Sequence, residues 1–275
     1  PYRWINFSAH SGTDCLPVLG QSYLKNTNLD IVVTMNTDHK NPSSYSFKKR
    51  SADERGATDL GWLKSRHTFS FGEYYDKDFI GFESLCVIND DVVAPGEGFG
   101  MHPHKDAEIF SYVIEGSLEH KDTLGHRTTI NAGEFQYMSA GSGILHSEYN
   151  PAPDKPVHFL QVWLKPNQLG GEPRYAEIRK DTVLTNNKMQ HLFFGSHVQG
   201  TIPQRQSAEI YMGRLETNGK LSMLTEEKPV WIHLIRGALK VGEENLKTGD
   251  GAAVRGAHNL DFKALEPTEF LVFLL

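Results

Sequence analysis

The sequence predicts an all-β protein made of two antiparallel β-barrels with few short helices. Two observations lead to this fold class. Short stretches of β-branched and aromatic residues alternate with turn residues along much of the chain, which is typical of barrels and sandwiches. The pattern of residues 109–118 then returns in outline at residues 230–239, and residues 131–135 are echoed by residues 247–251. Such an internal repeat indicates two barrels that share one duplicated plan.

The strands predicted before the repeat follow one another at short intervals. Gly116, residues 122–125 and residues 131–133 supply turns between them, and Gly141-Ser142-Gly143 lets the chain bend tightly. Strands are expected at residues 69–71, 82–89, 109–114, 117–120, 128–130, 135–138 and 157–164.

Two segments each carry a pair of potential metal ligands at positions i and i+2. The first pair is His102 and His104, and the second is His146 and Glu148. Successive side chains of a strand alternate between its faces, so the members of each pair point the same way. We expect both pairs at strand starts, close together in space because about two hairpins separate them. Three imidazoles and one carboxylate suit a first-row transition metal and leave coordination positions open, which is typical of a catalytic site.

Either pair alone is weak evidence. Roughly 0.6 His-x-His pairs are expected by chance from 13 histidines in 275 residues. His-x-Asp or His-x-Glu spacing occurs three times, beginning at His104, His120 and His146. A lone pair of this kind is more often solvated or structural, and it is the strand-and-turn context that favours a metal site. In the second half His233 and His258 are isolated, which indicates a single metal site in the first barrel.

Composition excludes several classes of protein. Hydrophobic residues make up 39% of the chain, and no run of about eighteen apolar residues occurs, so we expect no membrane span. The first residues lack the basic start and apolar core of a signal peptide. A net charge of -6 disfavours direct binding to nucleic acid. The two cysteines, Cys15 and Cys86, give no disulfide framework, so we expect a cytoplasmic protein.

Composition also divides the chain. Residues 1–46 show no sustained periodicity, and we expect an extension that is disordered or not native. Met35 suggests that residues 1–34 stem from a start site placed too far upstream; a peptide covering Cys15 in the natural protein would contradict this. A stretch rich in Pro and Gly follows the strand at residues 157–164. We therefore expect a metal-binding domain at residues 47–178 and a second domain without a metal site at residues 179–275.

The residues that carry this pattern resemble the pirin family, in the bicupin branch of the bacterial quercetin 2,3-dioxygenase type. The matching pieces are Gly61–Phe71, Phe99–Ile109, Glu115-Gly116, Ser139–Glu148 and Pro173–Tyr175. The resemblance covers residues 47–275 and is specific in the first barrel and loose in the second. It implies two jelly-roll-like cupin barrels, and a metal at His102, His104, His146 and Glu148, the residues that the spacing also indicates.

The resemblance further implies oxidative cleavage of a flavonol such as quercetin, with consumption of O2 and release of carbon monoxide. The implied cofactor is one divalent transition metal, with iron(II) first and zinc, nickel, cobalt, copper or manganese as alternatives. Glu148 would add the role of general base to that of ligand. Glu108 stands where other cupins carry a further glutamate, so it is an acid–base candidate or, alternatively, a carboxylate at the rim.

Other interpretations of the same residues stay open. The flat side chains of the first barrel are walls for an aromatic ligand or plain core: Phe110, Tyr112, Phe135, Tyr137 and Trp163. His67 is expected to be structural. A different class of function is a metal-bearing regulatory protein that acts through a protein partner without turnover of its own. A third possibility is another reaction on the same metal, such as an isomerisation or a lyase step.

Overall fold

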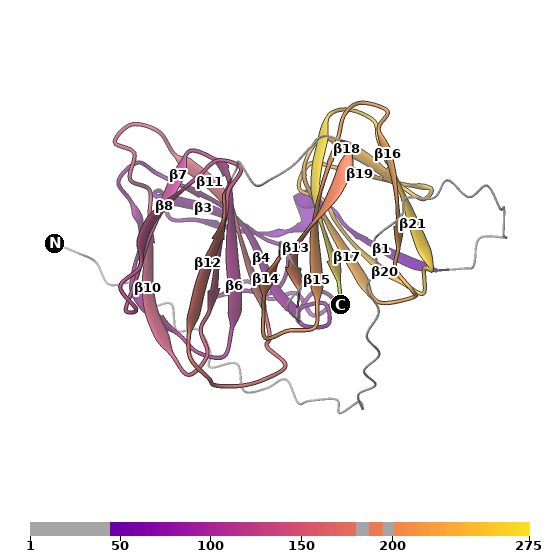
Figure 1. Ribbon diagram of the computed structural model, residues 1–275. Helices are drawn as coiled ribbons and strands as arrows, with labels where there is room; N and C mark the ends of the chain where they lie inside the picture. Colours follow the sequence, from indigo (N-terminus) through magenta and orange to yellow (C-terminus); the bar gives the residue numbers. More distant parts are fainter. Residues whose placement is uncertain (1–44, 180–186, 195–200) are drawn as a thin grey trace. The chain divides into compact units, whose positions relative to one another are not determined.

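The computed structural model describes residues 45–179, 187–194 and 201–275 (Figure 1). Nearly all regular structure in these ranges is β-strand, and the helical part there is one 3-10 turn at Ala52–Glu54. The strands form two sheets of seven and two sheets of four. The predicted all-β fold with two barrels is therefore confirmed. Of the extension expected at residues 1–46, residues 1–44 lie outside the described residues, and Ser46 already begins a strand.

The first barrel combines a seven-stranded sheet with a four-stranded sheet. The large sheet has the order β12-β9-β6-β11-β4-β3-β2, and the small sheet has the order β5-β10-β7-β8. The strands are β2 Gly56–Asp59, β3 Leu63–His67, β4 Leu85–Val93, β5 Gly98–His104, β6 Glu108–Glu115, β7 Ser117–Asp122, β8 Arg127–Asn131, β9 Phe135–Ser139, β10 Ile144–Tyr149, β11 Val157–Leu164 and β12 Arg174–Ile178.

The second barrel repeats this plan. Its sheets have the orders β1-β20-β17-β22-β15-β13-β14 and β16-β21-β18-β19. Strand for strand, β20-β17-β22-β15 corresponds to β9-β6-β11-β4, which confirms the internal repeat. The strands are β1 Ser46–Arg50, β13 Lys188–Phe194, β14 Ile202–Pro203, β15 Glu209–Leu215, β16 Lys220–Leu224, β17 Val230–Arg236, β18 Ala238–Val241, β19 Glu244–Lys247, β20 Gly251–Arg255, β21 Asn259–Ala264 and β22 Thr268–Leu274.

The first described strand belongs to the second barrel. β1 pairs antiparallel with β20, from Ser46 opposite Arg255 to Arg50 opposite Gly251. The domain expected at residues 47–178 includes residues 47–50, which the structure places in the large sheet of the second barrel. In the first barrel, β12 fills the matching edge by pairing with β9. No local pattern encodes a pairing between strands so distant in the sequence.

The central strands of each large sheet are buried on both faces. Along β6, Ile109, Ser111 and Val113 face the interior of the first barrel. Phe110 and Tyr112 point the other way, into a core between the two large sheets that also holds Phe193 and Phe273 of the second barrel. Burial on both faces explains why residues 109–114 read as a continuous apolar run with one serine. Burying each such phenylalanine contributes about 1.5–3 kcal/mol.

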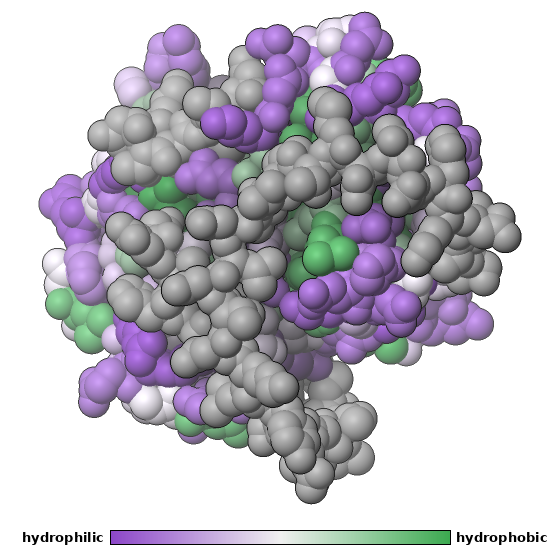
Figure 2. Space-filling model, turned by 45° about the vertical axis from the view of Figure 1, so that its right-hand side comes forward, coloured by the Kyte–Doolittle hydropathy of each residue, from purple (hydrophilic) through white to green (hydrophobic). Residues whose placement is uncertain are grey.

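On the face shown in Figure 2, hydrophilic side chains predominate and hydrophobic ones lie in small separate groups. Single exposed apolar residues of this kind need no special explanation. In the described residues, no helix has the length and apolar character needed to cross a membrane.

Candidate metal centre

Two neighbouring strands of the small sheet bring three histidines together. His102 and His104 lie at the end of β5, and His146 lies in β10. The strands pair antiparallel with His146 opposite His102. Alternation turns these imidazoles inward and leaves Met101 and Leu145 exposed on the outer face. Both pairs were expected at strand starts, but His102 and His104 end their strand, because β5 already begins at Gly98.

The three imidazoles converge closely enough to share an ion. One ligand atom from each of His102, His104 and His146 lies within 4.8 Å of the others. Nε2 of His146 is 3.1 Å from Nε2 of His102. Metal–nitrogen bonds of about 2.1 Å place neighbouring ligand nitrogens roughly 3.0–3.4 Å apart. The spacing of the His102 and His146 nitrogens therefore fits two ligands of one first-row transition metal, and the His104 ligand atom lies within 4.8 Å of both.

The electrostatics also favour metal binding. Burial, together with the neighbouring His146 and His102, lowers the pKa of His104 to about 3. Burial and the nearby His102 and His120 lower the pKa of His146 to about 2. Both rings are thus neutral near pH 7, as metal ligands must be. Nδ1 of His102 donates to the Gly100 carbonyl at 2.7 Å, which directs the lone pair of Nε2 towards the cluster.

Glu148 lies deeper in the first barrel. The β5–β10 register shifts between His146 and Glu148, an irregularity of the kind that re-aims side chains beside active sites. Glu148 is 1% exposed and accepts hydrogen bonds from Ser111 at 3.0 Å, from Gln161 at 2.6 Å and from Gln136. All three donors are neutral, and a buried carboxylate needs a compensating charge. A cation at this cluster would supply it, so the donor set fits a metal.

The structure divides the predicted ligands into two overlapping groups. His102, His104 and His146 form one group, and Glu148 joins His146 in a second group whose third member is His120. These are the groups of possible ligands within the described ranges, and both lie in the first barrel. The i, i+2 spacing of His120 and Asp122 is visible in the sequence, but on its own it indicated no role for these residues.

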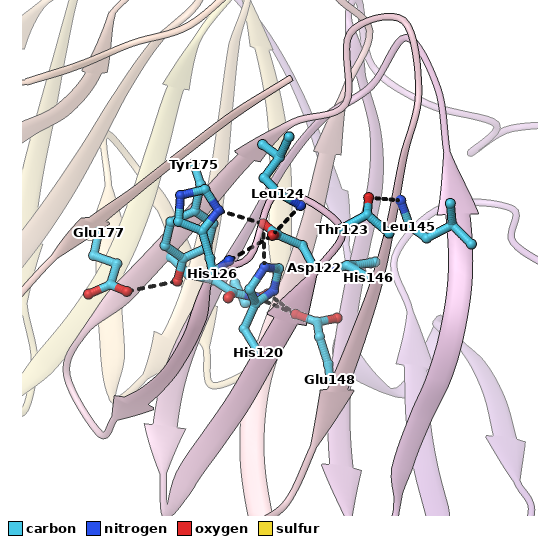
Figure 3. A network of polar contacts seen from close by, with 12 residues as sticks. His120, Asp122, Thr123, Leu124, His126, Leu145, His146, Glu148, Tyr175 and Glu177 are labelled. Carbon is cyan, nitrogen blue, oxygen red and sulfur yellow. Dashed lines mark hydrogen bonds and ion pairs between the residues drawn. The ribbon is translucent and has the colours of Figure 1, made fainter. Parts of the chain in front are cut away.

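His120 is held by a small polar network (Figure 3). Its Nε2 is 3.3 Å from Oδ2 of Asp122, which also accepts from Nδ1 of His126 at 2.8 Å. The ring of Tyr175 stacks on both His120 and His126, with centroids 4.7 Å apart in each case. The signal that could have revealed this network is the i, i+2 spacing on β7, the same signal that revealed the other pairs.

Glu108 does not reach the cluster. It is 1% exposed, so the interpretation as a rim carboxylate is wrong. It lies three residues before Ser111 on β6 and hence on the opposite face of that strand. There it accepts hydrogen bonds from Tyr137, from Ser139 at 2.6 Å and from the Arg205 backbone at 2.9 Å. These contacts tie segments of the two barrels together on the face of β6 opposite Ser111.

The alternation of side chains along the strands also decides which of the aromatic residues face the metal cluster. Phe110, Tyr112, Phe135 and Tyr137 belong to the core between the large sheets, so for these four the interpretation as plain core is confirmed. Trp163 is the exception, because its ring meets His104 edge-on at 4.8 Å. Trp163 packs against a cluster on the same side of the sheet, formed by Ile109, Met138, Ala140 and Ile144. His67 is structural as expected, since it bonds Thr58 and Asn89 at 2.8 Å each.

The second barrel has apolar residues at the corresponding positions. By the repeat and the strand registers, Met223 takes the place of His102, Leu260 that of His146, and Phe262 that of Glu148. These side chains belong to or pack against the core of the second barrel. His233 is buried among the large sheets and His258 is exposed on a turn. The apolar residues at these positions explain why, among the described residues, both groups of possible metal ligands lie in the first barrel.

Comparison with known proteins identifies the family of the chain. The family model described as Pirin matches residues 48–164, and the one described as the quercetinase C-terminal cupin domain matches residues 196–275. A protein of Escherichia coli K12 named quercetin 2,3-dioxygenase is 41% identical over 225 residues, which cover 82% of this chain and 96% of that protein. The chain belongs to the pirin family. The cupin barrels expected from the resemblance are thereby confirmed for this pirin.

Solved structures agree with this pirin assignment. The crystal structure of the Escherichia coli pirin YhhW in complex with nickel(II) has a TM-score of 0.80 and 40% identity, and the match covers 84% of this chain and 99% of that one. A quercetin 2,3-dioxygenase from Acinetobacter baumannii shares the fold at 20% identity, with a TM-score of 0.67 and coverage of 84% and 86%. A relative from Caulobacter vibrioides, 34% identical over 82% of this chain and 97% of its own, is named a pirin-like protein.

Proposed function

We propose that this pirin is a metal-dependent dioxygenase that cleaves a flavonol such as quercetin with O2 and releases carbon monoxide. The observation that carries the proposal is the cluster of three imidazoles beside a buried carboxylate whose hydrogen-bond donors are all neutral. The relative named quercetin 2,3-dioxygenase, 41% identical over 82% of this chain, supports the choice of substrate.

The proposed cofactor is one divalent transition metal, held by His102, His104, His146 and Glu148. We place iron(II) first; zinc, nickel, cobalt, copper and manganese accept the same ligands. The nickel(II) complex of the Escherichia coli pirin supports a metal of this class. When bound, the ion supplies Lewis acidity that lowers the pKa of a flavonol hydroxyl, and redox chemistry towards O2.

The protein's own residues bind, orient and move a proton. Glu148 is the proposed base that takes the proton of the flavonol hydroxyl onto a carboxylate oxygen. Ser111 and Gln136 bond its Oε1 and Gln161 bonds its Oε2, so the carboxylate is held at both oxygens. Trp163 offers an indole ring to a flat aromatic ligand next to His104.

The overall reaction balances without a further reductant. Both atoms of O2 enter the products, one carbon of the flavonol leaves as carbon monoxide, and the rest of the ring system is retained in the opened product. The partners are therefore a small aromatic molecule and O2, with no direct role for nucleic acid or a membrane. We place the reaction in the cytoplasm, because a chain with two cysteines in 275 residues has no disulfide framework.

Gas and product analysis tests the proposal. Iron(II)-loaded full-length protein with quercetin in air should release carbon monoxide and consume O2, while metal-free protein should do neither. Metal-loaded protein that leaves quercetin intact would overturn the proposal. Binding of a protein partner that depends on the metal would then support the regulatory role, and turnover without O2 would indicate another reaction on the same metal.

A further inference from the structure

His120 has the surroundings of a metal ligand. It is fully buried, and its Nδ1 has no hydrogen-bond partner. Its ligand atom lies within 4.8 Å of those of His146 and Glu148, and it stands directly opposite Glu148 in the β7–β10 pairing. Nδ1 of His146 is also buried without a partner. Two unpaired nitrogens in a buried site are costly unless something binds them.

The other side of the His120 ring is fixed. When Nε2 donates to Asp122 it carries the proton, and the lone pair then lies on the unpartnered Nδ1. Asp122 is itself held in place, because its Oδ1 accepts from the backbone of Leu124 at 2.9 Å and of His126 at 3.0 Å. Metal-binding histidines typically donate their second ring N–H to a carboxylate in this way. Figure 3 shows His120 lying between Asp122 and Glu148.

The repeat supplies an independent comparison. Val241 of β18 occupies the position in the second barrel that His120 occupies in the first. His120 stands opposite Glu148, and Val241 stands opposite Phe262, which replaces Glu148. Val241 is part of an apolar core, as are the residues that replace Glu148 and His146. The fold therefore accepts an apolar side chain at this position. A buried histidine occurs there in the barrel that also has the ligands.

We propose that His120, His146 and Glu148 form an inner binding position for a transition-metal ion, which shares His146 and Glu148 with the four-ligand position of the proposed function. Both positions include His146 and Glu148, and we take them as alternatives for a single ion. The inner position replaces the outer histidines, His102 and His104, with a histidine supported by Asp122. It deepens the metal site of the proposed function and does not depend on the identity of the substrate.

Removal of the outer histidines tests the inner position. Full-length protein with His102→Ala and His104→Ala is dialysed against cobalt(II), and bound metal is measured by elemental analysis. The inner position predicts that this variant still binds one equivalent. Adding His120→Phe, which keeps a ring against Tyr175 but removes both nitrogens, should weaken binding at least about tenfold. The same background with His258→Phe controls for binding by an unrelated histidine.

The outcomes separate this inference from the catalytic proposal, because metal binding is measured without turnover. No cobalt in the double variant would overturn the inner position, and so would cobalt binding that His120→Phe leaves unchanged. Circular dichroism and thermal unfolding check that each variant is folded. If the phenylalanine variant does not fold, His120→Asn gives the same comparison with a polar side chain.

Discussion

The hydrogen bonds to Glu148 give a sharp test of the site. Gln161→Leu removes the amide that donates to Oε2 of Glu148 at 2.6 Å and keeps a side chain of similar size. A hydrogen bond to a charged group contributes about 1.5–3 kcal/mol, which corresponds to roughly 10- to 150-fold in a binding constant. Loss of groups that support metal ligands typically weakens metal binding 10- to 100-fold. We therefore expect the affinity of Gln161→Leu for zinc to fall by about one to two orders of magnitude.

The assay is competition with a chelator of known affinity, followed by kcat for quercetin on metal-saturated protein. Gln204→Leu is the matched control, because Gln204 is also buried and bonds the Ala208 carbonyl at 2.6 Å in the second barrel. That control should lose stability but keep its affinity for zinc. Unchanged zinc affinity in Gln161→Leu, or an equal loss in Gln204→Leu, would refute the role assigned to this hydrogen bond.

Three further predictions concern the ligands, the faces of β6 and the buried histidine of β17. His146→Ala should lose metal and activity together while staying folded, and full metal occupancy in that variant would mean that the ligand assignment is wrong. Tyr112→Phe removes a buried hydroxyl that donates to Glu269 at 2.5 Å, so the unfolding free energy should fall by about 1–3 kcal/mol with metal affinity unchanged; an effect on the metal would contradict the face assignment. Burial lowers the pKa of His233 to about 3, so the folded protein keeps it neutral while the unfolded chain is protonated below about pH 6.5. Between pH 7 and pH 5 this residue should therefore lower the unfolding free energy by about 2 kcal/mol. In urea titrations, the unfolding free energy of His233→Phe should fall by about that much less over the same pH range. An equal fall in the wild-type protein and the variant would contradict a buried, neutral His233.

Local patterns predicted the parts of the fold that depend on local chemistry. The strand expected at residues 157–164 coincides with β11, because its alternating and β-branched residues suit a buried strand. The repeat between β6 and β17 was visible because Gly116 and Gly237 both adopt positive φ at the following turn. The pairing of β1 with β20 was not predictable, since it depends on which exposed edge a distant strand finds.

The sequence predicted which residue types form the site, but not how deeply each side chain is buried. Spacing identified His102, His104 and His146, because strand alternation alone puts i and i+2 on one face. It could not show that the register shift before Glu148 places this side chain among buried amides. Nor could it tell the faces of β6 apart, so Glu108 was a candidate although it faces the second barrel.

The pairing of β1 with the second barrel affects how the two barrels separate after proteolysis. Because β1 lies at the edge of the second large sheet, it comes before the first barrel in the sequence but belongs to the second barrel in space. A protease that cuts between β12 and β13 would leave two fragments still joined through the β1–β20 ladder, so nicking would not release them as separate pieces. A fragment that starts after β12 would instead expose the bare edge of β20, a surface on which unpaired strands aggregate. The two cupins are thus separate in architecture but inseparable by a single cut.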